Sequence, residues 1–231
     1  MPSIYFIDFI AIAPEFFMGV FICIFLFFGP LCLSQQTALF RKTFVLRDFS
    51  LKLSLLILLL TLILLVNSPI EFFIGFYGCL VFDFPSYVAK VLLVSLGICA
   101  ISVSKSFVKH VGFNSFECFL VLLISLLALL FIVSSFDLLG FYIAFELQSL
   151  AFYVLASFKR SSAFSTEAGL KYLIMGAFSS GLFLFGTSLI YGAVGTTNYA
   201  VFKLFFSLDF LNHFSIGLLF GLVFVTTSFF F

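Results

Sequence analysis

The chain has 231 residues, of which 64% are hydrophobic and only 9% are charged, and its formal net charge is +1. A water-soluble domain usually carries about 25% charged residues, so this chain has too few polar groups to cover a water-facing surface. Together with a mean hydropathy of +1.33, this predicts an integral membrane protein. The near-neutral charge excludes the basic footprint of a protein that binds nucleic acid.

Seven apolar stretches along the chain are candidates for membrane-spanning helices. About 20 apolar residues are needed to cross roughly 30 Å of hydrocarbon. The stretches that meet or approach this length are residues 11–33, 50–67, 86–104, 116–135, 138–158, 167–191 and 213–231. Their continuous apolarity lacks the alternation of barrel strands, and helices pair their own backbone groups. The sequence therefore predicts an all-α fold, with residues 1–231 forming a single transmembrane domain as a polytopic bundle of about seven helices.

Basic residues are concentrated in alternate connections between these stretches. Eight of the eleven lysines and arginines follow the first, third and fifth stretches: Arg41, Lys42, Arg47, Lys52, Lys105, Lys109, Lys159 and Arg160. Connections rich in Lys and Arg stay on the inner side of a membrane. The content of 40 phenylalanines and no tryptophan suggests an A/T-biased organellar genome. We therefore expect a multi-pass protein of the mitochondrial inner membrane, with its N-terminus on the intermembrane side.

Two charged residues, Glu146 and Lys171, lie well inside the expected spans. A charge near the bilayer centre costs about 2.5–3.5 kcal/mol on insertion scales. At the rise of an α-helix, Glu146 lies roughly 13 Å and Lys171 roughly 8 Å from the nearest expected helix end, on antiparallel neighbours. Their depths differ by roughly 10 Å, which leaves open whether they pair. We interpret them as a titratable relay; the alternatives are a structural carboxylate and an interfacial lysine.

The remaining polar candidates do not indicate a cofactor or metal site. His110 and His213 lie on opposite sides of the membrane in the expected topology, so they cannot ligate one haem or metal together. The five cysteines, which form no CxxC pair, are read as small apolar side chains: Cys23, Cys32, Cys79, Cys99 and Cys118. Pro14 and Glu15 are typical of a helix start, where proline is tolerated and a carboxylate suits the positive helix end.

Two long segments carry a resemblance to a known family. Residues 142–160, YIAFELQSLAFYVLASFKR, resemble the fifth helix of subunit 2 of the respiratory NADH dehydrogenases. Residues 166–195, which begin TEAGLKYLIMGAFSSGLFLFG, resemble its sixth helix. Pro14-Glu15 is similar to the opening Pro-Glu of the family. By position, Glu146 matches the helix-five glutamate and Lys171 the helix-six lysine, whereas Glu167 matches a family acidic residue that we give no proton role.

The resemblance implies an antiporter-like subunit in the membrane arm of respiratory complex I. Such a subunit would couple NADH:ubiquinone electron transfer to proton pumping, with Glu146 and Lys171 as its proton relay. It would therefore belong to an enzyme, the proton-translocating NADH:ubiquinone reductase, without a redox site of its own. No cofactor is expected in this chain, while FMN, iron–sulfur clusters and ubiquinone are expected elsewhere in the complex.

The resemblance also implies that the chain is the N-terminal half of such a subunit. It stops at Phe231, which by the resemblance is just before the helix-seven lysine of the family, and it lacks the later helices. We therefore expect a separately encoded C-terminal half, other membrane-arm subunits and membrane lipids as partners, and no nucleic acid. Two alternatives stay open: a structural membrane-arm component that no longer pumps, and a fragment of an independent cation/proton antiporter.

Overall fold

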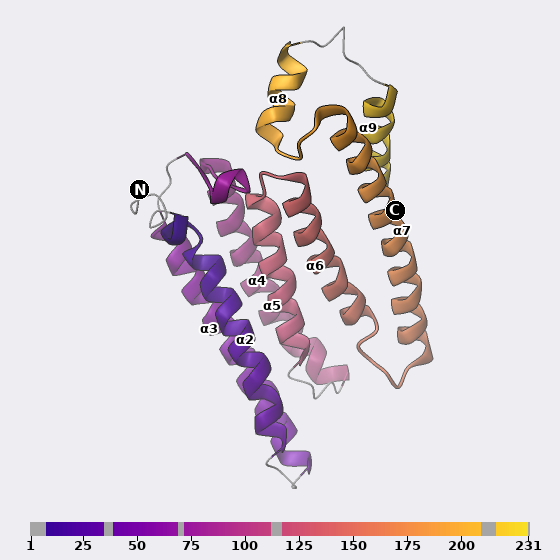
Figure 1. Ribbon diagram of the computed structural model, residues 1–231. Helices are drawn as coiled ribbons and strands as arrows, with labels where there is room; N and C mark the ends of the chain where they lie inside the picture. The colour runs from indigo at the N-terminus through magenta and orange to yellow at the C-terminus, as the bar shows by residue number, and fades with distance from the viewer. Residues whose placement is uncertain (1–7, 35–38, 69–71, 112–116, 209–215, 231) are drawn as a thin grey trace. The chain divides into compact units, whose positions relative to one another are not determined.

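The computed structural model describes residues 8–34, 39–68, 72–111, 117–208 and 216–230, and within these residues it is a set of long apolar helices (Figure 1). Five of the described helices are long and apolar enough to cross a membrane, and two more, Ala13–Phe28 and Ile216–Ser228, are apolar but shorter. This confirms the predicted all-α, polytopic helix bundle.

The helices follow the chain in the order in which the apolar stretches occur. Their bounds are α2 Ala13–Ser34, α3 Leu39–Val66, α4 Phe84–Val111, α5 Glu117–Ser134, α6 Leu138–Ala156, α7 Ala163–Val194, α8 Tyr199–Leu208 and α9 Ile216–Ser228. A small hairpin precedes α4, with strands β1 (Phe73–Gly75) and β2 (Leu80–Phe82) joined by the short helix η1 (Phe76–Gly78). The contacts divide the chain into unit 1, residues 1–73 and 82–134, and unit 2, residues 74–81 and 135–231.

The elements differ from the predicted stretches mainly at their polar ends. Helix α3 begins at Leu39 rather than at residue 50, because a helix can continue beyond the apolar run that hydropathy detects. Helix α8 occupies a segment that the sequence assigned to a connection. At about 1.5 Å per residue, its ten residues are too few to cross the hydrocarbon. The hairpin was not predicted either, since its strands have only three residues each.

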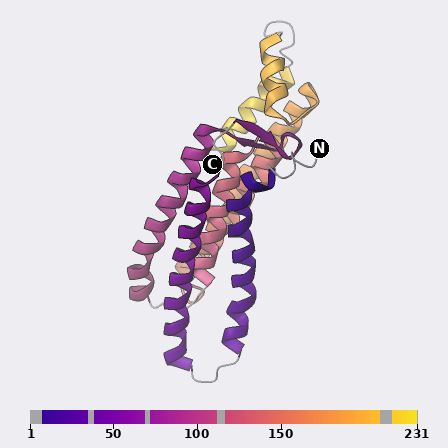
Figure 2. The same cartoon turned by 90° about the vertical axis from the view of Figure 1, so that its left-hand side faces the viewer.

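Unit 1 is a bundle of α2, α3, α4 and α5 around one apolar core (Figure 2). Each helix contributes fully buried side chains to it, among them Met18, Leu58, Val94 and Leu123. Buried hydroxyl groups in this core are satisfied within their own helix: for example, the Thr61 hydroxyl donates to the carbonyl oxygen of Leu58 at 2.9 Å. The helices therefore pack without leaving these hydroxyls unpaired.

Unit 2 is built on α7, which contacts both α6 and α9. Two glycines allow a close approach of α7 and α9: a Cβ atom on Gly186 would lie 2.8 Å from the carbonyl oxygen of Gly221. At the other end of α7, the Ser165 hydroxyl donates to the carbonyl oxygen of Ala156, at the end of α6, at 2.8 Å. These contacts hold α6 and α7 as neighbours, which is the arrangement that the candidate site requires.

Polar contacts also tie the start of α6 to the segment after α7. The Thr197 hydroxyl donates to Asp137 Oδ1 at 2.8 Å, and the Asn198 amide donates to the carbonyl oxygen of Gly78 at 2.9 Å. Burial and, to a lesser extent, the negative charge of Asp137 raise the pKa of the Tyr199 hydroxyl above its usual range. Tyr199 therefore stays protonated at physiological pH, next to the Asp137 carboxylate.

Candidate functional site

Glu146 lies in the third turn of α6 and is half-buried in unit 2. The Ser149 hydroxyl donates to the backbone carbonyl oxygen of Glu146 at 2.9 Å and lies 3.4 Å from its carboxylate Oε2. One turn earlier, the Tyr142 hydroxyl lies near both Glu146 and Ser180 of α7, and its ring stacks on Phe183 of α7 with the centroids 5.7 Å apart. The carboxylate is thus linked through Tyr142 to the neighbouring helix.

Lys171 lies in the first half of α7 and makes its ion pair within the same helix. Its ammonium Nζ is 2.6 Å from Glu167 Oε1, one turn earlier. The two side chains are 73% and 60% exposed in the described chain, so the pair lies on a face of α7 that unit 2 leaves uncovered. The sequence left open whether Lys171 pairs with Glu146. In the structure Lys171 pairs with Glu167 instead.

The two predicted relay residues are therefore on neighbouring helices of one unit but are not in direct contact. Glu146 is joined to α7 through Tyr142 and Ser180, whereas Lys171 lies nearer the start of α7 and is paired locally. Their role in proton movement stays a prediction.

A second pair of charges, which sequence reasoning missed, is buried in unit 1. Lys90 Nζ of α4 lies 2.6 Å from Glu15 Oε1 of α2, and the two side chains are 4% and 1% exposed. The same ammonium group lies 4.8 Å from the centroid of the Phe82 ring. The sequence reading of Glu15 as a helix start accounts for its position but not for its partner. The available signal was that both charges lie inside predicted apolar spans.

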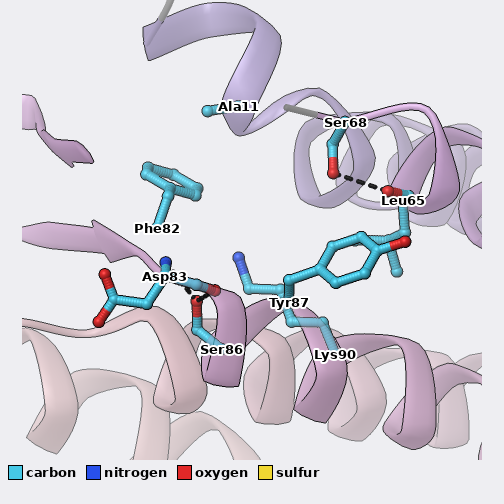
Figure 3. Close-up of a pocket in the computed structure, with 8 residues that line it drawn as sticks. All are labelled: Ala11, Leu65, Ser68, Phe82, Asp83, Ser86, Tyr87 and Lys90. Atoms are coloured by element: carbon cyan, nitrogen blue, oxygen red, sulfur yellow. Dashed lines mark hydrogen bonds between the residues drawn. The ribbon is translucent and has the colours of Figure 1, made fainter. Parts of the chain in front are cut away.

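A small cavity adjoins Lys90 (Figure 3). Its volume is about 20 Å³, and its lining combines apolar and polar side chains: Ala11, Leu65, Ser68, Phe82, Asp83, Ser86, Tyr87 and Lys90. A second cavity of about 240 Å³, in unit 2, is lined by apolar and aromatic side chains of α6, α7, α8 and α9. The small cavity is therefore partly polar and adjoins the buried ion pair. The lining of the larger cavity offers almost no polar atoms.

Within the described residues, no group of three or more His, Cys, Asp or Glu side chains is placed to hold a metal ion. Four cysteines, Cys23, Cys79, Cys99 and Cys118, have free thiols. The predictions for His110, His213 and Cys32 concern side chains that lie outside the described part of the chain.

Comparison with known proteins places this arrangement in a family. Residues 135–231 match the model of the NADH:quinone oxidoreductase/Mrp antiporter transmembrane family. The chain is 36% identical to NADH-ubiquinone oxidoreductase chain 2 of Marchantia polymorpha, over 97% of this chain and 46% of that protein. It is 41% identical to NADH-quinone oxidoreductase subunit N of Pelagibacter ubique, over 73% of this chain and 35% of that protein.

Solved structures show the same fold. A chain of respiratory complex I from Thermus thermophilus, solved with bound aureothin, superposes with a TM-score of 0.69 at 24% identity, covering 93% of this chain and 42% of that one. A chain of the archaeal membrane-bound sulfane sulfur reductase superposes with a TM-score of 0.66 at 17% identity, covering 96% and 43%.

The matched region from residue 135 onward contains α6 and α7, and with them Glu146, Tyr142 and Lys171. The chain spans about half the length of the relative that it matches over nearly its whole length. It has the antiporter-like membrane-subunit fold found in complex I. Residues 135–231 therefore belong to the NADH:quinone oxidoreductase/Mrp antiporter family of transmembrane proteins, and the chain as a whole is homologous to about half of NADH-ubiquinone oxidoreductase chain 2.

Proposed function

We propose that the chain is half of a proton-translocating subunit of respiratory complex I, in which electron transfer from NADH to ubiquinone drives proton movement through Glu146 and Lys171. The observation that carries this proposal is the polar link from Glu146 through Tyr142 to Ser180, which crosses between two apolar helices. The names of the relatives as NADH-ubiquinone and NADH-quinone oxidoreductases support it. In this proposal FMN, iron–sulfur clusters and ubiquinone are bound by other subunits.

The surroundings of Glu146 suit a carboxylate that gains and loses a proton. A carboxylate that takes part in a proton relay needs neighbouring hydroxyl groups that can donate a hydrogen bond to it. Ser149 and Tyr142 supply such donors. Both hydroxyls can also accept a hydrogen bond, so each can lie on a path along which a proton passes between α6 and α7.

The ion pair of Lys171 and Glu167, on α7, would modulate proton transfer along that path. A positive charge nearby lowers the proton affinity of a carboxylate, and its effect depends on how far Glu167 neutralises it. A change in the Lys171–Glu167 pair would therefore shift the affinity of Glu146 for its proton. Because electrostatic interactions are poorly screened in an apolar medium, this influence can act across the separation between the two groups.

We further propose that a polypeptide equivalent to the remaining half of the relatives covers the Lys171 face of α7. The face is rich in large apolar side chains, including Leu170, Ile174 and Phe178, which surround the exposed ion pair. Facing lipid, two charged groups would be costly, whereas a protein neighbour can supply polar partners. A mass-spectrometric inventory of the purified complex, with the intact mass of this chain, tests the proposal. A separate polypeptide carrying the remaining half supports it, whereas a longer single chain, or no NADH:quinone activity in the complex, contradicts it.

Lys171→Gln is expected to lower the number of protons translocated per NADH oxidised, because it removes the charge that tunes Glu146. The matched control is Glu167→Gln, which breaks the same ion pair but leaves the lysine charge in place. Proton uptake into proteoliposomes containing each purified variant, measured beside NADH oxidation, distinguishes two roles. Equal losses in both variants would mean that the pair matters only as a salt bridge, and the relay role of Lys171 would be wrong.

The charge asymmetry of the connections supports an orientation in which the loop between α3 and α4 faces the intermembrane space. Cys79 lies in this loop and is exposed. A membrane-impermeant maleimide is therefore expected to label it in intact mitoplasts, and Cys79→Ser should abolish that labelling. Ala200→Cys introduces a second thiol at an exposed position of α8 that is expected on the same side of the membrane. It is the control for the case in which a neighbouring subunit covers Cys79. Labelling of both positions only after permeabilisation would reverse the orientation.

A further inference from the structure

We propose that Glu15 and Lys90 form a second proton-binding site, located in unit 1 and hydrated by the adjoining cavity. The inference rests on the proposed function, because a proton-binding site in this bundle gains its role from proton translocation by the complex. It concerns different helices from those that carry Glu146 and Lys171.

Packing does not require a buried ion pair at this position. Lys90 and Glu15 are 4% and 1% exposed, so both groups have lost almost all of their hydration. Replacing such a pair by apolar residues of similar volume is often neutral or stabilising in other proteins, because desolvation offsets the attraction. In a chain that is 64% hydrophobic, an apolar contact between these two side chains would be the simpler solution. The pair is better explained by chemistry that needs its charges.

Both partners have unused hydrogen-bonding capacity. Both carboxylate oxygens of Glu15 are buried and have no hydrogen-bond partner among the described residues, although Lys90 Nζ lies 2.6 Å from Oε1. A lysine ammonium has three N–H donors. Its contacts with Glu15 and with the Phe82 ring, whose centroid is 4.8 Å away, leave at least one donor for another acceptor. In Figure 3 the Lys90 side chain reaches into the space between Phe82, Ala11 and Ser68.

The cavity next to Lys90 suits one water molecule. A volume of about 20 Å³ exceeds the roughly 10–15 Å³ that one water requires by this measure. The Ser68 hydroxyl donates to the carbonyl oxygen of Leu65 at 2.6 Å, and its oxygen can still accept a hydrogen bond. Lys90 as donor, and Ser68 and Ser86 as further partners, supply the two to four polar contacts that a buried water needs.

A further carboxylate lies before α2. Asp8 and Ala11 belong to a short helical segment that a turn at Ile12 separates from α2, and Ala11 lines the cavity. Asp8 is 7% exposed, and its Oδ1 has no hydrogen-bond partner among the described residues. Asp83, directly before α4, and Tyr87 of α4 line the cavity together with Lys90. Asp8, Asp83 and Tyr87 are therefore titratable groups near the ion pair.

The other helices of unit 1 carry their titratable groups elsewhere. Helix α3 contributes Leu65, near the end of the helix, to the lining of the cavity. Lys52 lies roughly 20 Å earlier along the same helix, at 1.5 Å per residue. On α5, Glu117 and Cys118 lie in the first turn, next to the end of α4 that is remote from Lys90. The site therefore consists of Glu15, Lys90 and the water, with Asp8, Asp83 and Tyr87 as its titratable neighbours.

Loading the site with a proton requires two balanced transfers. An N–H bond of the Lys90 ammonium breaks as an O–H bond forms on Glu15, giving a neutral amine and a carboxylic acid. A proton delivered through the cavity water then forms a new N–H bond on the amine. The loaded site holds one proton more than the ion pair and carries one positive charge, and the reverse steps release the proton.

Lys90→Arg tests the inference because it keeps the positive charge but cannot release a proton, since arginine stays protonated in proteins. A second variant, Glu15→Gln with Lys90→Gln, replaces the ion pair by a neutral amide pair that cannot titrate. Each variant complex is purified, reconstituted in liposomes and compared with Glu146→Gln for protons moved per NADH oxidised. We expect assembled Lys90→Arg complex to lose the same share of proton translocation that Glu146→Gln loses, with no further loss when both changes are combined.

The outcomes separate this inference from the proposed function. Full proton translocation by either assembled variant, beside a loss in Glu146→Gln, overturns the inference alone. Full translocation in Glu146→Gln overturns the proposed function. Failure of both unit 1 variants to assemble would assign the pair to assembly and likewise overturn the inference.

Discussion

Glu146→Gln is expected to leave the complex assembled and oxidising NADH while removing the protons that pass through this subunit. Glutamine has nearly the same shape as glutamate and keeps a hydrogen-bond acceptor for Ser149 and Tyr142, so the packing of α6 on α7 should survive. It cannot bind and release a proton in the physiological range. The loss should therefore appear in protons moved per NADH oxidised rather than in the amount of complex.

Two further variants show whether that loss reflects titration. Glu146→Asp retains a titrating carboxylate on a shorter side chain, so its effect should be smaller than that of the glutamine. Gln148→Met changes a polar residue in the same turn of α6, on a different part of the helix surface from Glu146. It should translocate protons normally. Both the proton uptake of proteoliposomes and the quinone-linked oxidation of NADH are measured; a normal proton ratio in Glu146→Gln would contradict the relay.

Lys90→Met alone is expected to cause the largest loss of stability of any single change considered. It leaves the Glu15 carboxylate buried without its cation, and breaking a buried ion pair typically costs about 3–5 kcal/mol. Glu15→Met alone leaves the Lys90 ammonium in the same position and should cost a similar amount. The amount of chain in the assembled complex, and its resistance to dissociation by detergent, report the loss.

The double variant, Glu15→Met with Lys90→Met, provides the control. It removes both charges and fills the space with apolar atoms, so much of the lost stability should return. Such recovery would give a favourable coupling energy for the pair in a double-mutant cycle. If the double variant is as unstable as the sum of the single ones, the two residues are not coupled and the ion pair does not contribute to the stability of unit 1.

The membrane class and the succession of helices could be predicted from the sequence because they depend on local properties. Apolar runs of adequate length must pair their backbone groups within themselves in a membrane, so each run independently predicts a helix. The helices Glu117–Ser134 and Leu138–Ala156 lie close to their predicted stretches for this reason. Helix ends with polar residues, such as the start of α3, depend on contacts outside the hydrocarbon and were predicted less well.

Within the candidate site, the identity of Glu146 and Lys171 followed from charge in an apolar span, but their partners did not. The i, i+4 spacing of Glu167 and Lys171 is visible in the sequence and permits the ion pair that forms. The contact of Tyr142 with Ser180 requires α6 and α7 to be rotated so that these two residues face each other. Hydropathy says nothing about helix rotation, because apolar residues surround both helices.

The sequence by itself determined that this is an all-helical membrane protein and which residues carry charge inside its spans. Only the tertiary structure decided which of those charges meet. Glu15 and Lys90 belong to helices that are far apart in the chain, and their separation of 2.6 Å depends on how α2 and α4 each pack on α3 and α5. That packing arises from side-chain shape along four long helices, a property that no local pattern contains.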